Sequence, residues 1–580
     1  MQHNKITKKN SELEIFNNNS EKLTSSLSEV MNKFKLKRQI SIFDFIKTKG
    51  LAISSLLNIL IILPFLGFAS VNSLVKSGIQ HIDIKSKKDA YYDVKNNELI
   101  NWRKLLFLHV KRFNYLINNN IHLKKKGATA LIFDDSKIEK TGKKIELIGM
   151  VHDHGTGIYI LGYKLLVCGF WDGGSFIPID FSLHREKGHK HFKLINACKR
   201  IEKQVVKQEK KVFVLEKRFA KKIKSLSKNQ SKYEKNRTNT RKKYYEKSKE
   251  QHEKTRRQYS KNKQELSKLK NEQKKSEKQL KSFYNKGKLY GLTTKERSEQ
   301  FKKTLSENSS GKLRRKEADQ SKISIMLQMI SRAVKHGIIP DYVITDSWFF
   351  CYDLLDKLKR IKKGSIKLIS MVKINNQKFT LCETKKEMSV KQILKIKERK
   401  HSRSKKMKAK YIKVPCYYKG IRVNLFYVKI GKSKTWHLLL TTDLSLSFNE
   451  LFELYQIRWS IEVFFKDAKQ HLKIGSCQSN CFDAQIADIT ISMLQYIMLI
   501  YFKRVNYQQS FGELFAKISS ELVEIDLLTG LLEILKELIQ LLCEVAGIDF
   551  IDFQKEVMKN EKILTKFIAL FPKKWIDKAA

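Results

Sequence analysis

The pattern of apolar positions changes its period several times along the chain. Apolar residues recur at helical spacing from residue 46 to about 122, which predicts a helical N-terminal region. From residue 128, apolar or alternating runs at 128–134, 159–170 and 175–181 are separated by glycine-rich turns and predict strands. The apolar run 51–71 nearly reaches the length of a membrane span, but Pro64 and several polar residues interrupt it. We therefore expect a buried helical hairpin there and no membrane partner.

The stretch that follows the third predicted strand has the pattern of a coiled coil. It contains no proline between Pro178 and Pro340. Two heptad series run through it, at Val205, Val212, Phe219, Leu226 and Tyr233, and at Tyr259, Leu266 and Leu280. The two series are out of phase, because 26 residues separate Tyr233 from Tyr259. We expect an antiparallel hairpin with arms near 193–235 and 243–285.

Beyond the hairpin, strands and helices alternate again. The pattern predicts a helix from Lys316 to Gly337, a strand that leads to Asp346, a helix at 349–361 and a strand at 366–372. Three further strands are expected at 414–418, 421–430 and 436–441, and a helix within 448–473. The remainder is leucine-rich, and the polar face of 523–546 indicates an amphipathic core or dimer helix.

Charge and cysteine content narrow the class of protein. The 580 residues include 116 Lys and Arg against 58 Asp and Glu, and a net charge of +58 favours nucleic acid as a partner. Residues 201–290 hold 31 of these cations against 10 acids, which suggests contact with DNA, although a solvated helical spacer is an alternative. The eight cysteines include no CxxC pair, and such usage is typical of a reducing cytoplasm.

One helical segment combines a carboxylate with several cations. Tyr455, Arg458, Glu462, Lys466 and Lys469 follow one another at steps of three, four, four and three residues. Those steps place all five side chains along one face of a helix. A carboxylate so surrounded suits a ligand of a divalent metal that lies beside a DNA phosphate backbone. A salt-bridged surface helix is the alternative that the spacing leaves open.

Two acidic positions upstream follow predicted strands. The first is the pair Asp134 and Asp135, and the second is Asp346. Asp341 comes before its strand and is expected in a turn. We also expect three other acids, Asp153, Asp172 and Asp180, at turns or strand edges, and Asp180 is close enough to a strand to support a site nearby.

The spacing Tyr-x2-Arg-x3-Glu-x6-Lys, present as Tyr455, Arg458, Glu462 and Lys469, resembles the signature helix of the IS-four-like group of bacterial insertion-sequence transposases. The resemblance covers roughly residues 45 to 475. It implies a DDE triad on an RNase H-like fold, with two aspartates upstream of the glutamate.

Catalytic and metal-binding roles follow from this resemblance for Asp134, Asp346 and Glu462. It favours Asp134 over Asp135, since the first acid of the corresponding pair in the group is the ligand. Ser136 departs from the threonine that the group often has. The implied cofactor is a pair of Mg²⁺ ions, with Mn²⁺ as a substitute.

DNA contacts are implied for the other signature residues. Tyr455, Arg458, Lys466 and Lys469 would contact phosphates, Arg458 with a bidentate fork. Trp436 is the candidate to capture a flipped base, His437 is the alternative one residue later, and a buried core role for the tryptophan is the third possibility. The implied partners are double-stranded DNA, both terminal inverted repeats and target, and a second copy of the chain in a synaptic homodimer.

The expected fold class is α/β, with an RNase H-like core of a mixed five-stranded sheet and helices. We expect seven regions: an N-terminal helical, DNA-end-binding domain at 1–122 (1–45 partly disordered), core at 123–192, a basic coiled-coil hairpin at 193–290, core at 291–372, a β-rich insertion at 373–441, the core helix at 442–475 and a C-terminal helical domain at 476–580 that suits dimerisation. The predicted function is Mg²⁺-dependent cleavage at the ends of an insertion sequence and strand transfer by a bacterial, cytoplasmic, nucleoid-associated enzyme. Two alternatives are a catalytically decayed or domesticated DNA-binding protein and a basic coiled-coil scaffold that binds nucleic acid.

Overall fold

The computed structural model describes residues 26–68, 70–76, 87–153, 155–433, 435–506 and 510–560, together with 562, 565 and 566. The expectation of disorder near the N-terminus therefore lies largely outside the described residues, and 26–41 form helices α2 (Ser26–Lys33) and α3 (Leu36–Ser41). The chain forms two compact units. The larger unit contains 1–138, 164–184 and 302–580, and the smaller unit contains 139–163 and 185–301.

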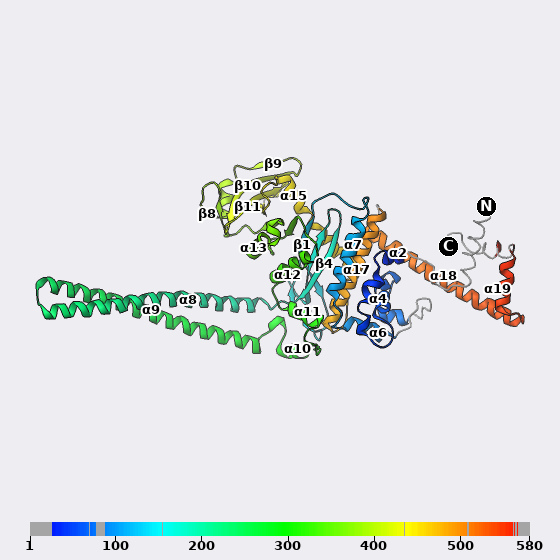
Figure 1. Ribbon diagram of the computed structural model, residues 1–580, viewed down its shortest axis with the longest axis horizontal. Coiled ribbons are helices and arrows are strands. Elements are labelled where there is room, and N and C mark those ends of the chain that lie inside the picture. The colour runs from blue at the N-terminus through cyan, green and yellow to red at the C-terminus, as the bar shows by residue number, and fades with distance from the viewer. Residues whose placement is uncertain are drawn as a thin grey trace. The chain divides into compact units, whose positions relative to one another are not determined.

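A mixed sheet forms the centre of the larger unit (Figure 1). Its strands lie in the order β4 (Phe176–His184), β3 (Tyr159–Trp171), β1 (Ala130–Glu139), β5 (Tyr342–Thr345) and β6 (Lys367–Val372). β1 pairs with β5, and β5 with β6, in parallel, whereas β3 and β4 are antiparallel. All nine residues of β4 are buried, because helices α7 (Trp102–Asn118), α11 (Ser310–Ala318), α12 (Lys322–Lys335) and α17 (Phe482–Asn506) pack against it.

The sheet continues through the region where a β-rich insertion is expected. Beyond β6 the order is β12 (His437–Thr441), β11 (Ile421–Ile430), β10 (Ala409–Tyr418), β7 (Lys378–Leu381) and β8 (Glu387–Ser389), with β9 (Ser402–Ser404) on β10 and α14 (Val390–Lys397) after β8. The strands expected at 414–418, 421–430 and 436–441 correspond to β10, β11 and β12. β10 is longer at its start because its first residues pair with β9 and β11.

Helices from both ends of the chain complete the larger unit. They are α4 (Ile53–Ile62), the short helix Leu63–Leu66, α5 (Val71–Lys76) and α6 (Lys88–Asn96) in the N-terminal part, and α18 (Phe511–Val545) and α19 (Phe550–Lys559) after α17. Most of the apolar run 51–71 forms α4 and the single-turn helix Leu63–Leu66 that follows it directly. The expected hairpin of two helices is therefore one helix of ten residues followed by one short turn of helix. Within the described residues α17 alone has the length and apolar composition to cross a membrane, and 83% of its apolar stretch is buried, as in the core helix of a soluble protein.

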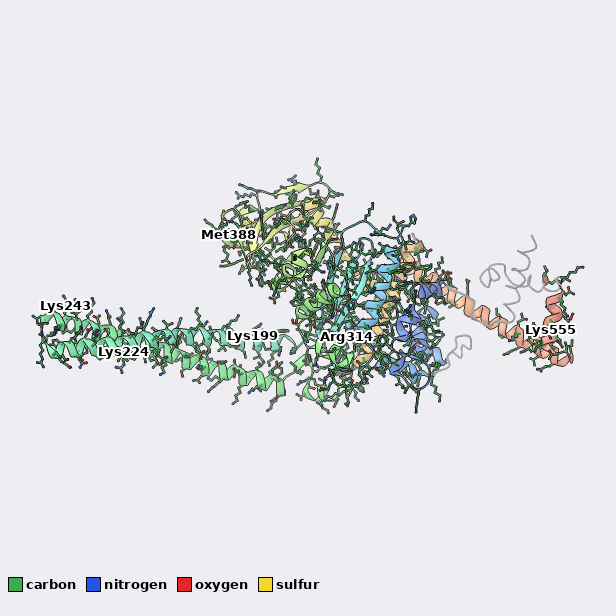
Figure 2. The ribbon with its side chains drawn as sticks, in the orientation of Figure 1. Lys199, Lys224, Lys243, Arg314, Met388 and Lys555 are labelled. Carbon is green, nitrogen blue, oxygen red and sulfur yellow. The ribbon has the colours of Figure 1, made fainter. Side chains whose placement is uncertain are left out.

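Two long helices dominate the smaller unit, α8 (His189–Lys235) and α9 (Asn239–Lys286) (Figures 1 and 2). Phe219 stacks on Tyr259 with ring centroids 5.6 Å apart, and Tyr233 stacks on Tyr245 at 5.8 Å. Gln208 donates to the side chain of Asn262 at 3.0 Å. Partner numbers rise along one helix as they fall along the other, so the pair is antiparallel. Strand β2 (Gly149–His152), which the apolar pattern did not indicate, pairs with residues 159–162 in this unit.

Asp180 lies within β4, the terminal strand on its side of the sheet, and not at a turn. It is fully buried, although β4 has a single neighbouring strand. The Nε atoms of Arg103 and Arg332 donate to its two carboxylate oxygens at 2.8 and 2.7 Å. Burial acts to raise the pKa of Asp180, but Arg103, Arg332 and Arg314 outweigh it and hold this pKa below its ordinary value. Asp153 and Asp172, by contrast, accept hydrogen bonds from backbone amides within turns, as expected.

The same cluster buries a third arginine. Arg314 (Figure 2) is 3% exposed, and its guanidinium lies 4.5 Å from the centre of the Phe181 ring. Burial, and then the nearby charge of Arg103, lower the pKa of Arg314 to about 9. The Glu317 carboxylate contributes a second negative charge, since Arg103 donates to it at 2.8 Å. Three arginines and two acids therefore tie α7, α11 and α12 to β4.

We expect Asp180→Asn to destabilise the larger unit by about 3–5 kcal/mol, because it leaves buried arginines without their counter-charge. Thermal unfolding followed by circular dichroism measures the change. Asp341→Asn is the matched control. Asp341 is exposed and accepts from the Thr129 amide, and an asparagine oxygen can do the same. Equal unfolding midpoints for the two variants would contradict the structural role of the cluster.

Candidate active site

The pairing of β1 with β5 brings two of the predicted acids together. Their parallel register ends at the pair Phe133 and Thr345, so Asp134 and Asp346 follow at the same edge of the sheet. Neighbouring strands lie about 4.8 Å apart, which places the two residues side by side. β1 itself continues to Glu139, so Asp134 lies within the strand rather than at its end as the sequence suggested.

The two aspartates have different surroundings. The carboxylate of Asp346 accepts from the backbone amides of Trp348 and Phe349 at 2.9 and 3.3 Å, which fixes it in a turn. Asp134 is 20% exposed. Burial raises the pKa of Asp134 to about 7, and the charges of Asp135 and Asp346 add to this effect. The acids Asp134, Asp135 and Asp346 thus lie close together at this edge of the sheet, and Arg458 offsets only part of the rise in the pKa of Asp134.

Arg458 links Asp134 to the third predicted acid. One terminal nitrogen of its guanidinium donates to Glu462 at 2.6 Å, and the other lies 3.5 Å from a carboxylate oxygen of Asp134. Arg458 is 13% exposed and Glu462 is 37% exposed. Asp134, Asp346 and Glu462 thus belong to one neighbourhood, and the largely buried guanidinium of Arg458 lies between Asp134 and Glu462.

The signature segment forms two helices and not the single helix that its spacing predicted. α15 (Phe448–Gln456) begins at a capping box formed by Ser447 and Glu450, and α16 (Trp459–Gln470) follows after a break. At the break the amide of Arg458 donates to Tyr455 three residues back, at 3.1 Å. The sequence holds no glycine or proline here. The break coincides with the residue whose side chain is held by β1, so tertiary contact outweighs local helix propensity.

The five signature side chains differ in their surroundings. Lys469 donates to the hydroxyl of Ser136 on β1 at 2.6 Å. Tyr455 is buried, and burial raises its pKa to about 12. Lys466 is exposed, and among the described residues the structure shows no contact between it and the three acids. Four of the five residues therefore lie toward the acidic edge, and Lys466 does not share that contact.

Asp135, the alternative ligand, already has a counter-charge. Its carboxylate binds the ammonium of Lys322 at 2.5 Å. The same ammonium lies 4.3 Å from the centre of the Trp348 ring. Lys322 thus contacts the segments that carry both aspartates. Sequence reasoning missed it, because the helix predicted from Lys316 to Gly337 begins as α12 only at Lys322, after the cap Ser321.

Trp436 lies apart from these contacts in the described residues. It comes directly before β12, is half-buried, and donates from its indole nitrogen to Glu398 at 2.9 Å. Trp436 is therefore not among the fully buried residues of the core. His437 is exposed at the first position of β12, where it pairs with Val428.

The acidic edge fits a hard divalent cation in the type of its ligands. Carboxylate oxygens are preferred by such ions, and one or two carboxylates with water and phosphate oxygens suffice. Within the described ranges, no three His, Cys, Asp or Glu side chains are grouped so as to hold a metal as they stand. The carboxylate of Glu462 accepts from Arg458 at 2.6 Å.

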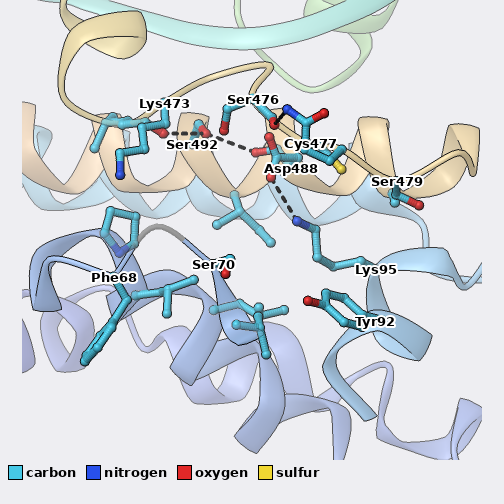
Figure 3. A pocket seen from close by; sticks show the side chains of 18 of the residues that line it. Phe68, Ser70, Tyr92, Lys95, Lys473, Ser476, Cys477, Ser479, Asp488 and Ser492 are labelled. Atoms are coloured by element: carbon cyan, nitrogen blue, oxygen red, sulfur yellow. Dashed lines mark hydrogen bonds and ion pairs between the residues drawn. The ribbon is translucent and has the colours of Figure 1, made fainter. Parts of the chain in front are cut away.

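A separate pocket lies among α4, α6 and α17 (Figure 3). Lys95 and Asp488 form an ion pair across it at 2.9 Å. Burial acts to lower the pKa of Lys95, but the charge of Asp488 raises it above the ordinary value. The lining includes none of the residues predicted as site residues. We therefore place the candidate active site at the acidic edge of the sheet.

Comparison with known families identifies a similarity in part of the chain. Residues 313–498 match the model of the transposase DDE domain family, a range that includes Asp346 and Glu462 and begins after Asp134. No curated protein matches the chain. A DDE domain implies an RNase H-like fold, which the mixed sheet fits, and enzymes of this type generally use divalent metals. The match over residues 313–498 indicates that this part of the chain is similar to the transposase DDE domain, a domain of enzymes that act on DNA.

Proposed function

We propose that the protein is an insertion-sequence transposase of the IS-four-like group, which cuts at the ends of its element and joins the freed 3′-hydroxyls to target DNA. The observation that carries the proposal is the neighbourhood of Asp134, Asp346 and Glu462, in which parallel strands supply two acids and Arg458 reaches the third. The Tyr455, Arg458, Glu462 and Lys469 spacing supports assignment to this group.

Asp134, Asp346 and Glu462 are the residues that would hold two Mg²⁺ ions, with Mn²⁺ as a substitute. When bound, two such ions stabilise the attacking and leaving oxygens of an in-line displacement at phosphorus. Asp134 and Asp346 follow one another across the parallel pairing of β1 and β5, so two carboxylates lie at one edge of the sheet, which is the type of ligand that Mg²⁺ prefers. Asp346, fixed by two backbone amides, presents its second oxygen at the same edge.

Arg458 would change its partner when DNA binds. Without DNA its guanidinium neutralises Glu462 and lies near Asp134. A DNA phosphate is a stronger bidentate partner for arginine than an exposed carboxylate, so DNA would draw the guanidinium away and release Glu462. Lys469, two turns beyond Glu462 along α16, would bind a neighbouring phosphate. The ring of Tyr455 packs near Arg458, with 6.0 Å between the ring centre and the guanidinium.

Further DNA contacts are proposed for two accessible residues. Lys466 is exposed on α16 and suits a phosphate outside the acidic edge. Trp436 is half-buried, and its indole nitrogen donates to Glu398, so it is the proposed acceptor of a base flipped from the DNA end. The substrate is double-stranded DNA with terminal inverted repeats.

A homodimer in a synaptic complex is the proposed assembly. The apolar residues Leu531, Ile534, Leu538, Leu541 and Val545 of α18 are between 47% and 88% exposed. They follow one another at steps of three and four, which is the a/d spacing of a coiled-coil seam. A seam of this kind that is exposed in the single chain supports pairing with a second copy.

End cleavage by the purified protein tests the proposed function. With Mg²⁺ and a labelled duplex that ends in the inverted repeat, we expect strand cleavage that EDTA abolishes. Asp346→Asn and Glu462→Gln should each reduce the rate at least about a hundredfold, since loss of a metal ligand costs several kcal/mol of transition-state stabilisation. Both variants should still bind the duplex in a gel-shift assay. Wild-type protein that binds the end and never cuts it would point to a decayed DNA-binding protein instead.

Two neighbouring substitutions test which aspartate is the ligand. We expect Asp134→Asn to lower cleavage at least about a hundredfold, because it removes the carboxylate beside Asp346. Asp135→Asn should lower it less than about tenfold, because Asp135 is bound to Lys322. Both changes remove one negative charge from the same strand, so each controls for the other. A reversed order of the two effects would assign the ligand to Asp135.

A further inference from the structure

The hairpin of α8 and α9 lies outside the region matched by the transposase family, and the catalytic proposal leaves it without a role. Its packing shows which side of each helix points away from the partner helix. On α8, Val205 and Gln208 are buried against α9, and Val212, Leu215 and Phe219 continue this seam at heptad spacing. The opposite side of α8 therefore faces solvent.

That solvent-facing side of α8 is a continuous line of lysines. Lys203, Lys210, Lys217 and Lys224 follow one another at intervals of seven, and Lys207, Lys221 and Lys228 occupy the adjacent line. All seven are exposed, and Lys224 is marked in Figure 2. No acidic residue lies on either line between Lys203 and Lys228. We call these seven residues the α8 lysine face.

The acids of α8 in this stretch lie elsewhere. Glu202, Glu209 and Glu216 are also seven apart, and they follow the edge of the seam. Glu209 binds Lys270 of α9 at 2.9 Å, and Glu216 accepts from the hydroxyl of Tyr259. The negative charges thus serve contacts between the two helices. The α8 lysine face therefore carries positive charges with no acidic residue among them.

This separation of charge distinguishes a binding surface from a soluble spacer. A solvated helix gains from glutamate and lysine alternating at steps of four, and from both signs mixed over its surface. Seven lysines on one face repel one another and cost stability unless an anion is bound. The lysine face spans 25 residues, which is about 37 Å of helix. One turn of duplex DNA is about 34–36 Å long, so several phosphates of one face of a duplex lie within its reach.

We propose that the α8 lysine face is a second DNA-binding surface, which holds the phosphate backbone of duplex DNA without regard to sequence. The choice of DNA over other polyanions rests on the proposed function. Lysine suits this role, since it binds a phosphate as a flexible point charge, and no side chain on the face has the geometry to distinguish bases. The surface would retain flanking or target DNA while the acidic edge acts on the element's end.

The salt dependence of DNA binding tests the proposal in the full-length protein. The test variant carries Lys203→Gln, Lys210→Gln, Lys217→Gln and Lys224→Gln. The matched control carries Lys249→Gln, Arg256→Gln, Lys263→Gln and Lys270→Gln on α9, along the line beside the seam. Both lose four positive charges from one helix of the hairpin. Circular dichroism and the unfolding midpoint show whether each variant keeps its helices.

Binding is measured by fluorescence anisotropy with a random-sequence duplex of about three helical turns across a range of salt concentrations. Each lost phosphate contact lowers the slope of log K against log salt by about 0.9, so we expect the test variant to lose about 3 to 4 units of slope. The control should lose less than one unit. An unchanged slope in the test variant, or equal losses in both variants, would overturn the proposal.

Two further measurements separate this surface from the active site and from other nucleic acids. Glu462→Gln should retain the wild-type slope, so a failure of end cleavage leaves the result on the lysine face intact and distinguishable. A duplex RNA of equal length serves as competitor. Tighter binding of RNA than of DNA by the wild type, lost in the test variant, would overturn the assignment to DNA.

Discussion

The parallel pairing of β1 with β5 is the constraint on which the candidate site depends. Backbone hydrogen bonds between two buried strands fix Phe133 opposite Thr345, and the next residue of each strand is an aspartate. The strands bring together carboxylates that would otherwise repel one another, and the fold stabilises this arrangement through its buried core. Burial raises the pKa of Asp134, and the charges of Asp135 and Asp346 add to this rise.

Arginine and lysine have separate roles around this sheet. Arginines pair with the acids of the core and the site: Arg103 and Arg332 flank the buried Asp180, and Arg458 lies between Asp134 and Glu462. A planar guanidinium can satisfy two carboxylates at once and loses little hydration on burial, which explains the preference. Lysines supply most of the outward charge, as on α8, where long flexible stems keep the ammonium groups in water.

The break between α15 and α16 illustrates how a functional site overrides local preference. Nothing in the residues from Tyr455 to Lys469 interrupts a helix, and their spacing alone describes one continuous face. The link at Arg458 uses bonds three residues apart instead of four. After this link Lys469 contacts Ser136 of β1 and Glu462 contacts Arg458, whereas Lys466 remains exposed.

The sequence by itself determined features that depend on short-range periodicity. The heptads predicted two antiparallel helices, α8 and α9, the alternating runs indicated β3 and β4, and apolar strands indicated Asp134 and Asp346 as the acids that follow them. Only the tertiary structure decided the partners of the acids on the strands: Lys322 for Asp135, three arginines for Asp180, and Arg458 for Asp134. The physical reason is that periodicity sets which way a side chain faces on its own element. The counter-charge of each of these acids comes from another element, between 77 and 324 residues away along the chain, and only the packing of the whole sheet places it.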